Sequence, residues 1–339
     1  MKIFPLTLIP NDTNIDFMRM RVASLVVATL LALAAIGAIA YNHFTKGAAF
    51  NYALDFTGGV GVELHFPRAP GVDAVRDRLA AAGFEDAQVQ TYGTGSDLLV
   101  RLQDSGEHAA KTGTVGNPAE ADESTAAGIA QDIAKAASTP DNVAEVRSSS
   151  VISAQVGRDL ARNAAMAMAF VIIGFMAYIA FRFEWKFAVA AILTTLHDVL
   201  VVAGFFAFTQ REFDLTLLAG LLTVMGFSIN DTIVVFDRVR ENFRTMRADP
   251  LTVLNTSINQ TLSRTIITSF VAFLTGLALY IYGGGSLEGM AVSQMLGIVI
   301  GTISSIFVAC TLLTYGPLKV TKQDLLPKAK DEAALARRP

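Results

Sequence analysis

Six long apolar runs constrain the fold of this 339-residue chain more than any other feature of its sequence. They cover residues 22–41, 161–181, 187–208, 215–236, 265–282 and 290–313. A helix that crosses a bilayer needs roughly 20 mostly apolar residues. Only 17% of the residues are charged, whereas soluble proteins have about a quarter. The sequence therefore predicts a polytopic α-helical membrane protein with six transmembrane helices. It excludes an ordinary cytosolic enzyme and a disordered chain.

The basic residues predict which side of the membrane each segment occupies. The first run is longer than the roughly 7–15 apolar residues of a signal peptide, so we interpret it as a retained span. Both termini then share one side, whose segments contain sixteen Lys and Arg residues. The short loops opposite, at 209–214 and 283–289, contain only Arg211. Because basic residues concentrate on the cytoplasmic side, both termini are predicted to be cytoplasmic.

This orientation predicts the division of the chain. The expected segments are a cytoplasmic N-terminal segment (1–21), a first transmembrane helix (22–41), an extracytoplasmic domain (42–160), five transmembrane helices (161–313) with a cytoplasmic amphipathic segment (237–264), and a basic cytoplasmic tail (314–339). Asp249 followed by Pro250 is typical of a helix start, and we expect the helix that begins there to lead into the fifth span.

The segment between the first two spans alternates between strand and helix patterns. Strands are expected at 61–66, 87–92, 97–103 and 142–150, and helices at 72–82 and 120–137. The order βαββαβ predicts an α+β ferredoxin-like domain, a fold that by itself names no function. The segment is acidic, which argues against binding of nucleic acid. Gly58 and Gly59 form either a hinge or a tight turn, and residues 148–157 are expected to lead into the next span without a rigid support.

The sequence contains no motif for nucleotide or zinc chemistry. Neither a phosphate-binding loop nor His-Glu-x-x-His occurs. The single cysteine, Cys310, cannot form an intramolecular disulfide. We therefore predict that the chain is not an enzyme and has no cofactor. Energy for any transport would come from a partner or an ion gradient.

Ionisable residues inside the predicted spans are candidate functional residues, because a charge within a membrane is costly. Asp231 lies in the fourth span, where a carboxyl group either exchanges protons or only bonds a neighbouring helix. Arg264 begins a stripe of small and hydroxyl residues in the fifth span. It is either functional or an anchor whose side chain reaches water. In the third span, Asp198 either relays protons with His197 or has a structural role. Adjacent helix residues point about 100° apart, so these two are expected not to share one partner.

The sixth span carries Gly297, Gly301 and Ser305 at helical spacing. Small residues of this kind allow two membrane helices to approach closely. We interpret these three residues as a packing surface.

Several of these motifs resemble those of one known family. The stretch from Phe227 to Asn242, FSINDTIVVFDRVREN, closely resembles the signature of the SecF family of bacterial protein-translocase subunits. This stretch includes Ser228, Asn230, Asp231, Asp237 and Arg238. The run Leu54-Asp55-Phe56-Thr57-Gly58-Gly59 resembles a motif that the family shares with SecD. Leu196-His197-Asp198 and Ser263-Arg264-Thr265 also fit, and the resemblance covers about residues 16–317.

The resemblance implies a subunit of the RND superfamily in the bacterial inner membrane, with its soluble domain in the periplasm. Members of the family pair with SecD, join the SecYEG channel and YajC, and use the proton motive force to promote late-stage translocation of unfolded preproteins. Asp231 and Arg264 match intramembrane positions that are functional in the family, with protons as the coupling ion. Two alternatives remain open from the sequence: one half of a proton-driven RND exporter of lipids or small molecules, and an assembly subunit that does not pump.

Overall fold

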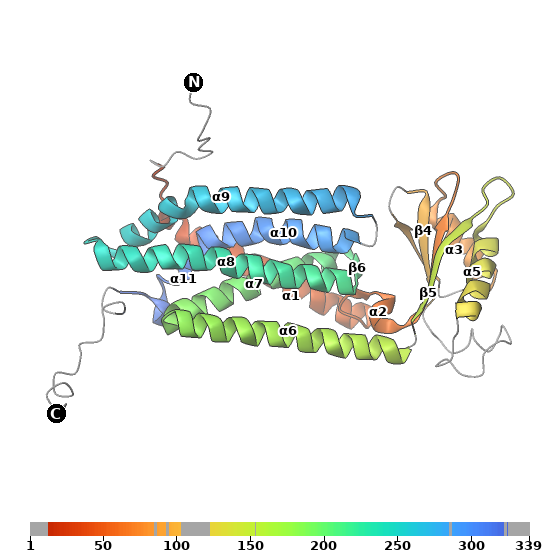
Figure 1. Ribbon diagram of the computed structural model, residues 1–339, viewed down its shortest axis with the longest axis horizontal. Helices are drawn as coiled ribbons and strands as arrows, with labels where there is room; N and C mark the ends of the chain where they lie inside the picture. Colours follow the sequence, from red (N-terminus) through yellow and green to blue (C-terminus); the bar gives the residue numbers. More distant parts are fainter. Residues whose placement is uncertain are drawn as a thin grey trace, which may run out of the picture.

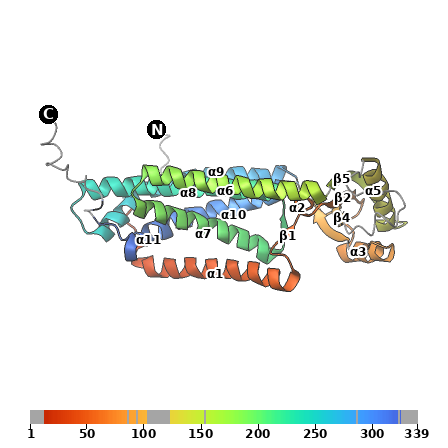
Figure 2. The same cartoon turned by 90° about the horizontal axis from the view of Figure 1, so that it is seen from below.

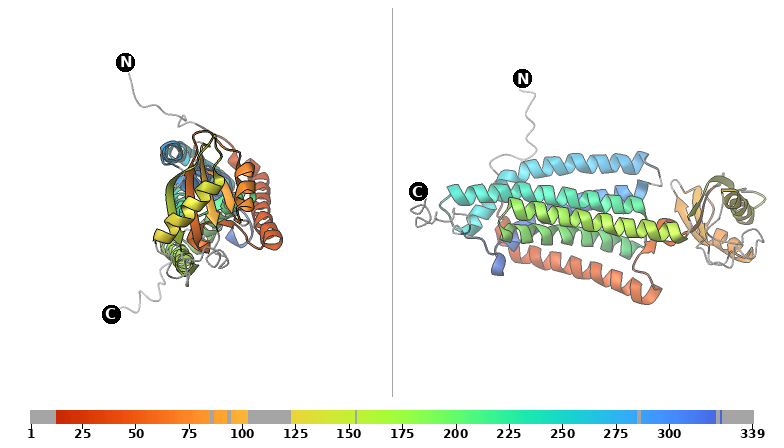
Figure 3. Two further views of the ribbon diagram at one scale, coloured as in Figure 1. Left: turned by 90° about the vertical axis from the view of Figure 1, so that its right-hand side faces the viewer. Right: turned by 60° about the horizontal axis from the view of Figure 1, so that its bottom comes forward.

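A computed structural model of the chain describes residues 13–84, 87–92, 95–102, 123–152, 154–284, 287–321 and 324. The molecule is elongated, with a helical bundle and a small α+β domain at one end of it (Figure 1). Viewed end-on, the α+β domain lies in front of the bundle (Figure 3).

The bundle contains the six membrane spans that the sequence predicts. Its helices are α1 (Arg21–Lys46), α6 (Ala154–Arg182), α7 (Trp185–Thr209), α8 (Leu215–Thr245), α9 (Pro250–Tyr282) and α10 (Glu288–Ser304). The sixth span continues from α10 through a π-helical turn (Ser305–Ala309) into α11 (Cys310–Leu312). A 3₁₀ turn (Phe17–Met20) precedes α1, and another (Gly316–Leu318) follows α11.

Local sequence signals set the starts of two long helices. The carboxylate of Asp214 accepts a hydrogen bond from the backbone N–H of Leu217 at the start of α8. Asp249 caps α9 in the same way through Thr252, with Pro250 in the first turn, which confirms the expected helix start. From there α9 runs without a break through the fifth span. The second part of the predicted amphipathic segment therefore forms one helix with the span, whereas its first residues belong to the end of α8.

Glycines allow the spans to pack closely. A Cβ atom on Gly204 of α7 would lie 2.3 Å from the Cβ of Ala35 on α1. A Cβ on Gly297 of α10 would lie 2.1 Å from a methyl carbon of Val224 on α8. Helices α7, α8 and α10 are the most buried spans, whereas α1 lies along one edge of the bundle (Figure 2).

The α+β domain confirms the ferredoxin-like prediction. Its elements are β2 (Gly59–His65), α3 (Val72–Ala81), β3 (Gln88–Tyr92), β4 (Asp97–Leu102), α5 (Glu123–Ala137) and β5 (Glu145–Ile152). The strands form an antiparallel sheet in the order β3-β4-β2-β5. Helices α3 and α5 cover the face away from the bundle (Figures 1 and 2). Val62, Val100 and Ile133 are fully buried between sheet and helices. Residues 103–122, between β4 and α5, lie outside the described part of the chain.

Three short elements at the junction with the bundle are not predicted from the sequence. Strand β1 (Asn51–Tyr52) pairs in parallel with β6 (Glu212–Phe213), which lies between α7 and α8. The one-turn helix α2 (Leu54–Thr57) follows β1. Gly58 and Gly59 then adopt positive φ angles of 75° and 128°, so this pair forms a tight turn into β2, where other residues would be strained.

The expectation that residues 148–157 lack a rigid support is wrong. Ser148, Ser149 and Ser150 belong to β5 and pair with β2. A Cβ atom on Gly157 of α6 would lie 3.1 Å from the backbone nitrogen of Gly58. The chain therefore leaves the domain against the same short segment through which it enters.

Candidate functional site

Two carboxyl groups are buried in the centre of the bundle. Asp198 comes from α7 and is 0% exposed, and Asp231 comes from α8 and is 4% exposed. An unpaired charge in such a place is costly. The hydrogen-bond partners of each carboxyl group therefore determine what the site can do.

Asp231 accepts hydrogen bonds from two neighbouring helices. The hydroxyl of Ser305, in the sixth span, donates to Oδ2 over 2.6 Å. The hydroxyl of Thr265, on α9, donates to Oδ1 over 3.2 Å. Asp231 thus connects α8 to both α9 and the sixth span.

Asp198 has its own pair of hydroxyl donors. Ser228 of α8 and Ser304 of α10 each donate to its Oδ2 over 2.6 Å. Nδ1 of His197 lies 3.0 Å from its Oδ1, and Nε2 of His197 lies 3.1 Å from the backbone oxygen of Ala28. His197 and Asp198 thus contact each other and have different partners otherwise.

Ser304 and Ser305 link the two carboxyl groups. They are consecutive in the chain, and each donates to a different aspartate at 2.6 Å. On α8, Ser228 lies one helical turn before Asp231 and donates to Asp198. We call Asp198, Ser228, Asp231, Ser304 and Ser305 the carboxyl–serine cluster. The π-helical turn begins at Ser305, and π turns within helices occur frequently at functional sites.

Both linking serines have a second acceptor within reach. The hydroxyl oxygen of Ser305 lies 3.0 Å from the carbonyl of Thr302, and that of Ser304 lies 3.1 Å from the carbonyl of Gly301. When an aspartate takes up a proton, its own O–H becomes a donor. The serine can then accept from the aspartate and donate to its backbone carbonyl, so that neither group loses its hydrogen bond.

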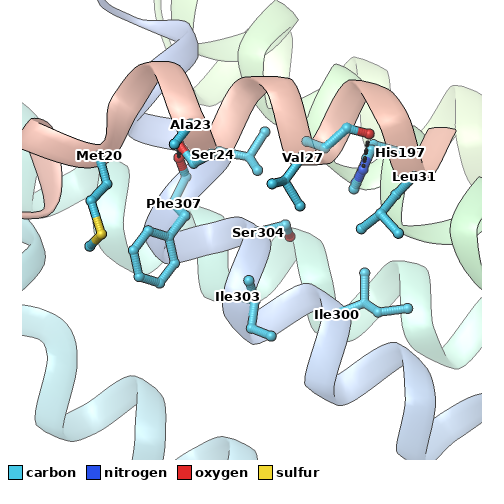
Figure 4. Close-up of a pocket in the computed structure, with 12 residues that line it drawn as sticks. Met20, Ala23, Ser24, Val27, Leu31, His197, Ile300, Ile303, Ser304 and Phe307 are labelled. Carbon is cyan, nitrogen blue, oxygen red and sulfur yellow. Dashed lines mark hydrogen bonds between the residues drawn. The ribbon is translucent and has the colours of Figure 1, made fainter. Parts of the chain in front are cut away.

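A cavity of about 280 Å³ reaches the cluster from the side of α1. Its walls are mainly apolar side chains of α1 and the sixth span, with His197 and Ser304 among them (Figure 4). Since both residues contact Asp198 directly, the cavity lies one side chain away from a buried carboxyl group.

Arg264 and Asn230 lie on the surface of the bundle. Thr265, and not Arg264, contacts Asp231, and the side chain of Arg264 is exposed. Among the residues that the structure describes, Arg264 forms no ion pair. Asn230, next to Asp231, is also exposed. Two polar side chains therefore face outward at the level of the buried carboxyl group.

The other motif residues lie outside the cluster. Asp55 accepts a hydrogen bond from the backbone N–H of Leu215, the first residue of α8, and Phe56 packs against Phe213. Thr57 donates to the carbonyl of Ala53. Asp237 binds Arg182 through both carboxylate oxygens at 2.9 Å, and Arg238 pairs with Glu241. Asp55, Phe56 and Asp237 therefore connect different segments at the two ends of the bundle, whereas the contacts of Thr57 and Arg238 are local.

The predicted packing residues lie against α8. Gly297 faces Val224, and Gly301 lies close to both Ser228 and Asp198. Ser305 belongs to the cluster itself. Sequence reasoning missed Ser304, although consecutive hydroxyl residues within an apolar span could have indicated it. No group of three or more His, Cys, Asp or Glu side chains suited to a metal ion occurs in the described part of the chain.

Comparisons of the sequence identify relatives along nearly its whole length. Residues 132–317 match the family described as "Protein export membrane protein SecD/SecF, C-terminal". The chain is 40% identical to the protein translocase subunit SecF of Pseudomonas aeruginosa, over 94% of this chain and 96% of that protein. It is 37% identical to SecF of Vibrio alginolyticus, over 93% of each.

A solved structure has the same fold. The crystal structure of SecDF, a translocon-associated membrane protein from Thermus thermophilus, aligns with a TM-score of 0.73 at 35% identity. The alignment covers 90% of this chain and 39% of that longer one. A SecDF structure described as a super-membrane-facing form aligns with a TM-score of 0.56. With a family match over more than half of its length and relatives at up to 40% identity, this multi-pass membrane chain belongs to the SecD/SecF family, as a SecF subunit.

Proposed function

We propose that this chain acts with SecD to promote late-stage translocation of preproteins across the bacterial inner membrane, driven by the proton motive force. Family membership implies the association with SecD. The observation that carries the proton-driven part is the carboxyl–serine cluster, in which two buried carboxyl groups have hydroxyl partners that can reverse direction.

The proposed proton step occurs at Asp231. As a carboxylate, Asp231 accepts from Ser305 and Thr265. After proton uptake its O–H donates to Ser305, whose hydroxyl turns to the carbonyl of Thr302. The charge on α8 disappears, so the attraction between α8 and its neighbours changes. One charge crossing 100 mV supplies roughly 2.3 kcal/mol, which is enough to bias two arrangements of packed helices.

Asp198 and His197 form the second part of the proposed proton path. Ser304 donates to Asp198, and the next residue, Ser305, donates to Asp231. His197 lines the cavity on the other side of Asp198. A histidine ring can accept a proton at one nitrogen and give one up at the other. A proton that reached the cavity would meet His197, then Asp198, then the two serines.

We propose that SecD covers the outward polar surface at Arg264 and Asn230. Polar side chains at membrane depth are expected to face protein or water and not lipid. Arg264 has no ion-pair partner within the described chain, so a carboxylate on SecD is the expected partner. Coulomb attraction between Arg264 and Asp231 would then link proton uptake to the contact with SecD.

The remaining partners follow from the orientation. With both termini in the cytoplasm, the α+β domain projects into the periplasm, where it can bind an unfolded preprotein that emerges from SecYEG. YajC is proposed as an accessory partner because members of the family join it. The preprotein-binding surface is assigned to the α+β domain as a whole.

The deciding experiment measures export of a reporter preprotein into inverted membrane vesicles, with and without a proton gradient. We expect Asp231→Asn to insert and assemble normally and to lose the increase in export that the gradient causes. Glu241→Gln is the matched control, because Glu241 is an exposed carboxylate on the same helix.

Two results would contradict the proposal. If Asp231→Asn responds to the gradient like the wild type, the chain is better described as an assembly subunit that does not pump. If the gradient acts on export of lipid or of a small molecule and not of the preprotein, the exporter alternative is favoured.

A further inference from the structure

Arg101 is a buried cation on an unexpected face of the α+β domain. It lies on β4 and is 3% exposed. Its neighbours Val100 and Leu102 are buried in the core beneath α3 and α5. Because successive strand residues point to opposite faces, Arg101 projects from the face toward the bundle. Opposite it on β2 is Gly61, where a Cβ atom would lie 2.8 Å from Leu54 of α2.

One carboxylate pairs with this guanidinium, and two more act on it through their charge. Nη2 of Arg101 forms an ion pair with Glu212 of β6. The pKa of Arg101 is lowered to about 10, mainly by burial. The negative charges of Asp214 and Asp55 offset part of this effect. The group therefore stays charged at neutral pH. We call Asp55, Glu212 and Asp214 the acidic socket.

The acidic socket belongs to the start of α8. Asp214 caps this helix through the N–H of Leu217, and Asp55 accepts from the N–H of Leu215. Glu212 lies two residues before Asp214 in the chain, within the β1–β6 pair. Arg101 is thus a side chain of the α+β domain that pairs with the short strand immediately before a membrane helix. Asp231 lies on the same helix, about 25 Å further along at about 1.5 Å per residue.

The burial of this ion pair distinguishes it from the other pairs in the domain. Arg76 and Arg147 also pair with aspartates, and these two arginines are 50% and 56% exposed. Exposed pairs contribute little to structure, whereas removal of one partner from a buried pair leaves an uncompensated charge. The position of the domain relative to α8 therefore depends strongly on Arg101.

We propose that Arg101 is the positioning residue that fixes the α+β domain to the start of α8, so that the domain follows α8 when Asp231 changes its protonation state. The inference rests on the proposed function for its link to protons. It does not depend on that function for the anchoring itself. The domain then needs no separate signal, because α8 carries both the proton site and the domain's attachment point.

The first test measures export in inverted vesicles and asks whether the charge of the Arg101 side chain or its size matters. Arg101→Ala should lose most of the gradient-dependent increase and keep the gradient-independent export. Arg101→Lys should retain part of the increase because it keeps the positive charge. The double variant Arg101→Glu with Glu212→Arg reverses the pair and should restore part of it. Arg147→Ala removes an exposed arginine from the same sheet and is the matched control.

The second test measures the position of the domain directly. Spin labels at Asp73→Cys on α3 and Phe208→Cys on α7 give one distance distribution, and both positions are exposed. Cys310 is fully buried and stays unlabelled. The distribution should be narrow in the wild type, broad in Arg101→Ala and narrow again in the charge-reversed pair.

Each combination of results decides the proposal. An unchanged distribution in Arg101→Ala overturns the anchoring, whatever happens to export. A broadened distribution with a full gradient response overturns the link to the proton step. If Asp231→Asn itself retains the gradient response, the proposed function fails. The distance measurement then still decides the anchoring on its own.

Discussion

Ser305 donates its hydroxyl hydrogen to Asp231 across 2.6 Å, from the first residue of a π-helical turn. In a π turn the backbone bonds pass to the fifth residue, and the turn is less regular than an α-helix. The serine that contacts the central carboxyl group therefore lies where its helix can most easily change geometry. Proton uptake and a change in the sixth span can be the same event.

We expect Ser305→Ala to reduce the gradient-dependent increase in export severalfold. The substitution removes a hydrogen bond to a charged group, worth about 1.5–3 kcal/mol, and with it the reversible partner of Asp231. Ser305→Thr keeps the hydroxyl and should retain more of the response. The measurement is vesicle export at equal protein level. Thr223→Ala is the control, because that hydroxyl binds only its own helix turn.

Arg264→Ala should reduce gradient-dependent export far more than Arg264→Lys. Under the proposed function, the exposed guanidinium supplies positive charge near Asp231 and toward SecD, and lysine keeps that charge. If lysine fails as completely as alanine, Arg264 binds a carboxylate through two nitrogens. Normal export by Arg264→Ala at normal protein levels would leave only the role of a membrane anchor.

Gly297→Ala should destabilise the bundle by about 1–3 kcal/mol, the usual cost of overpacking. Its new Cβ would overlap Val224, whose side chain is buried between α8 and α10. Gly174→Ala is the matched control in α6, because nothing lies within 4 Å of its Cβ position. Thermal unfolding in detergent measures the difference, and equal unfolding temperatures for the two variants would refute the close contact.

Asp249→Ala should increase hydrogen exchange at the Thr252 amide, and the effect should depend on pH. The side chain and backbone of Thr252 bond the Asp249 carboxylate and hold its pKa below the usual value. A lowered pKa in the folded state means that the contribution is present above the unfolded pKa. It is lost as the pH falls through the folded pKa. The difference between variant and wild type should therefore be large at neutral pH and vanish in acid.

The elements that can be located from the sequence are those whose hydrophobic pattern extends over many residues. Six apolar runs and the alternating patterns of the α+β domain each extend over many residues, so local sequence determines them. The strands β1 and β6 have two residues each, too few to show any period. Their pairing depends on contact between segments far apart in the chain.

The candidate site was predicted only in part, for a related reason. Asp198 and Asp231 were identifiable because carboxyl groups are rare in apolar runs. Their connection through Ser304 and Ser305 depends on how three helices are rotated about their axes, which spacing within one helix does not determine. Arg101 gives no signal at all, because an arginine at an alternate position of a strand normally faces water.

The contact between Gly157 and Gly58 makes the α+β domain an insertion with adjacent ends. The chain enters and leaves the domain at almost the same point on the bundle, as at sites where natural proteins tolerate inserted domains. The membrane helices could therefore assemble with a short linker in place of residues 60–153. A domain of different size could replace this one without moving any helix. Under the proposed function, the part assigned to the exported chain can then diverge while the carboxyl–serine cluster stays the same.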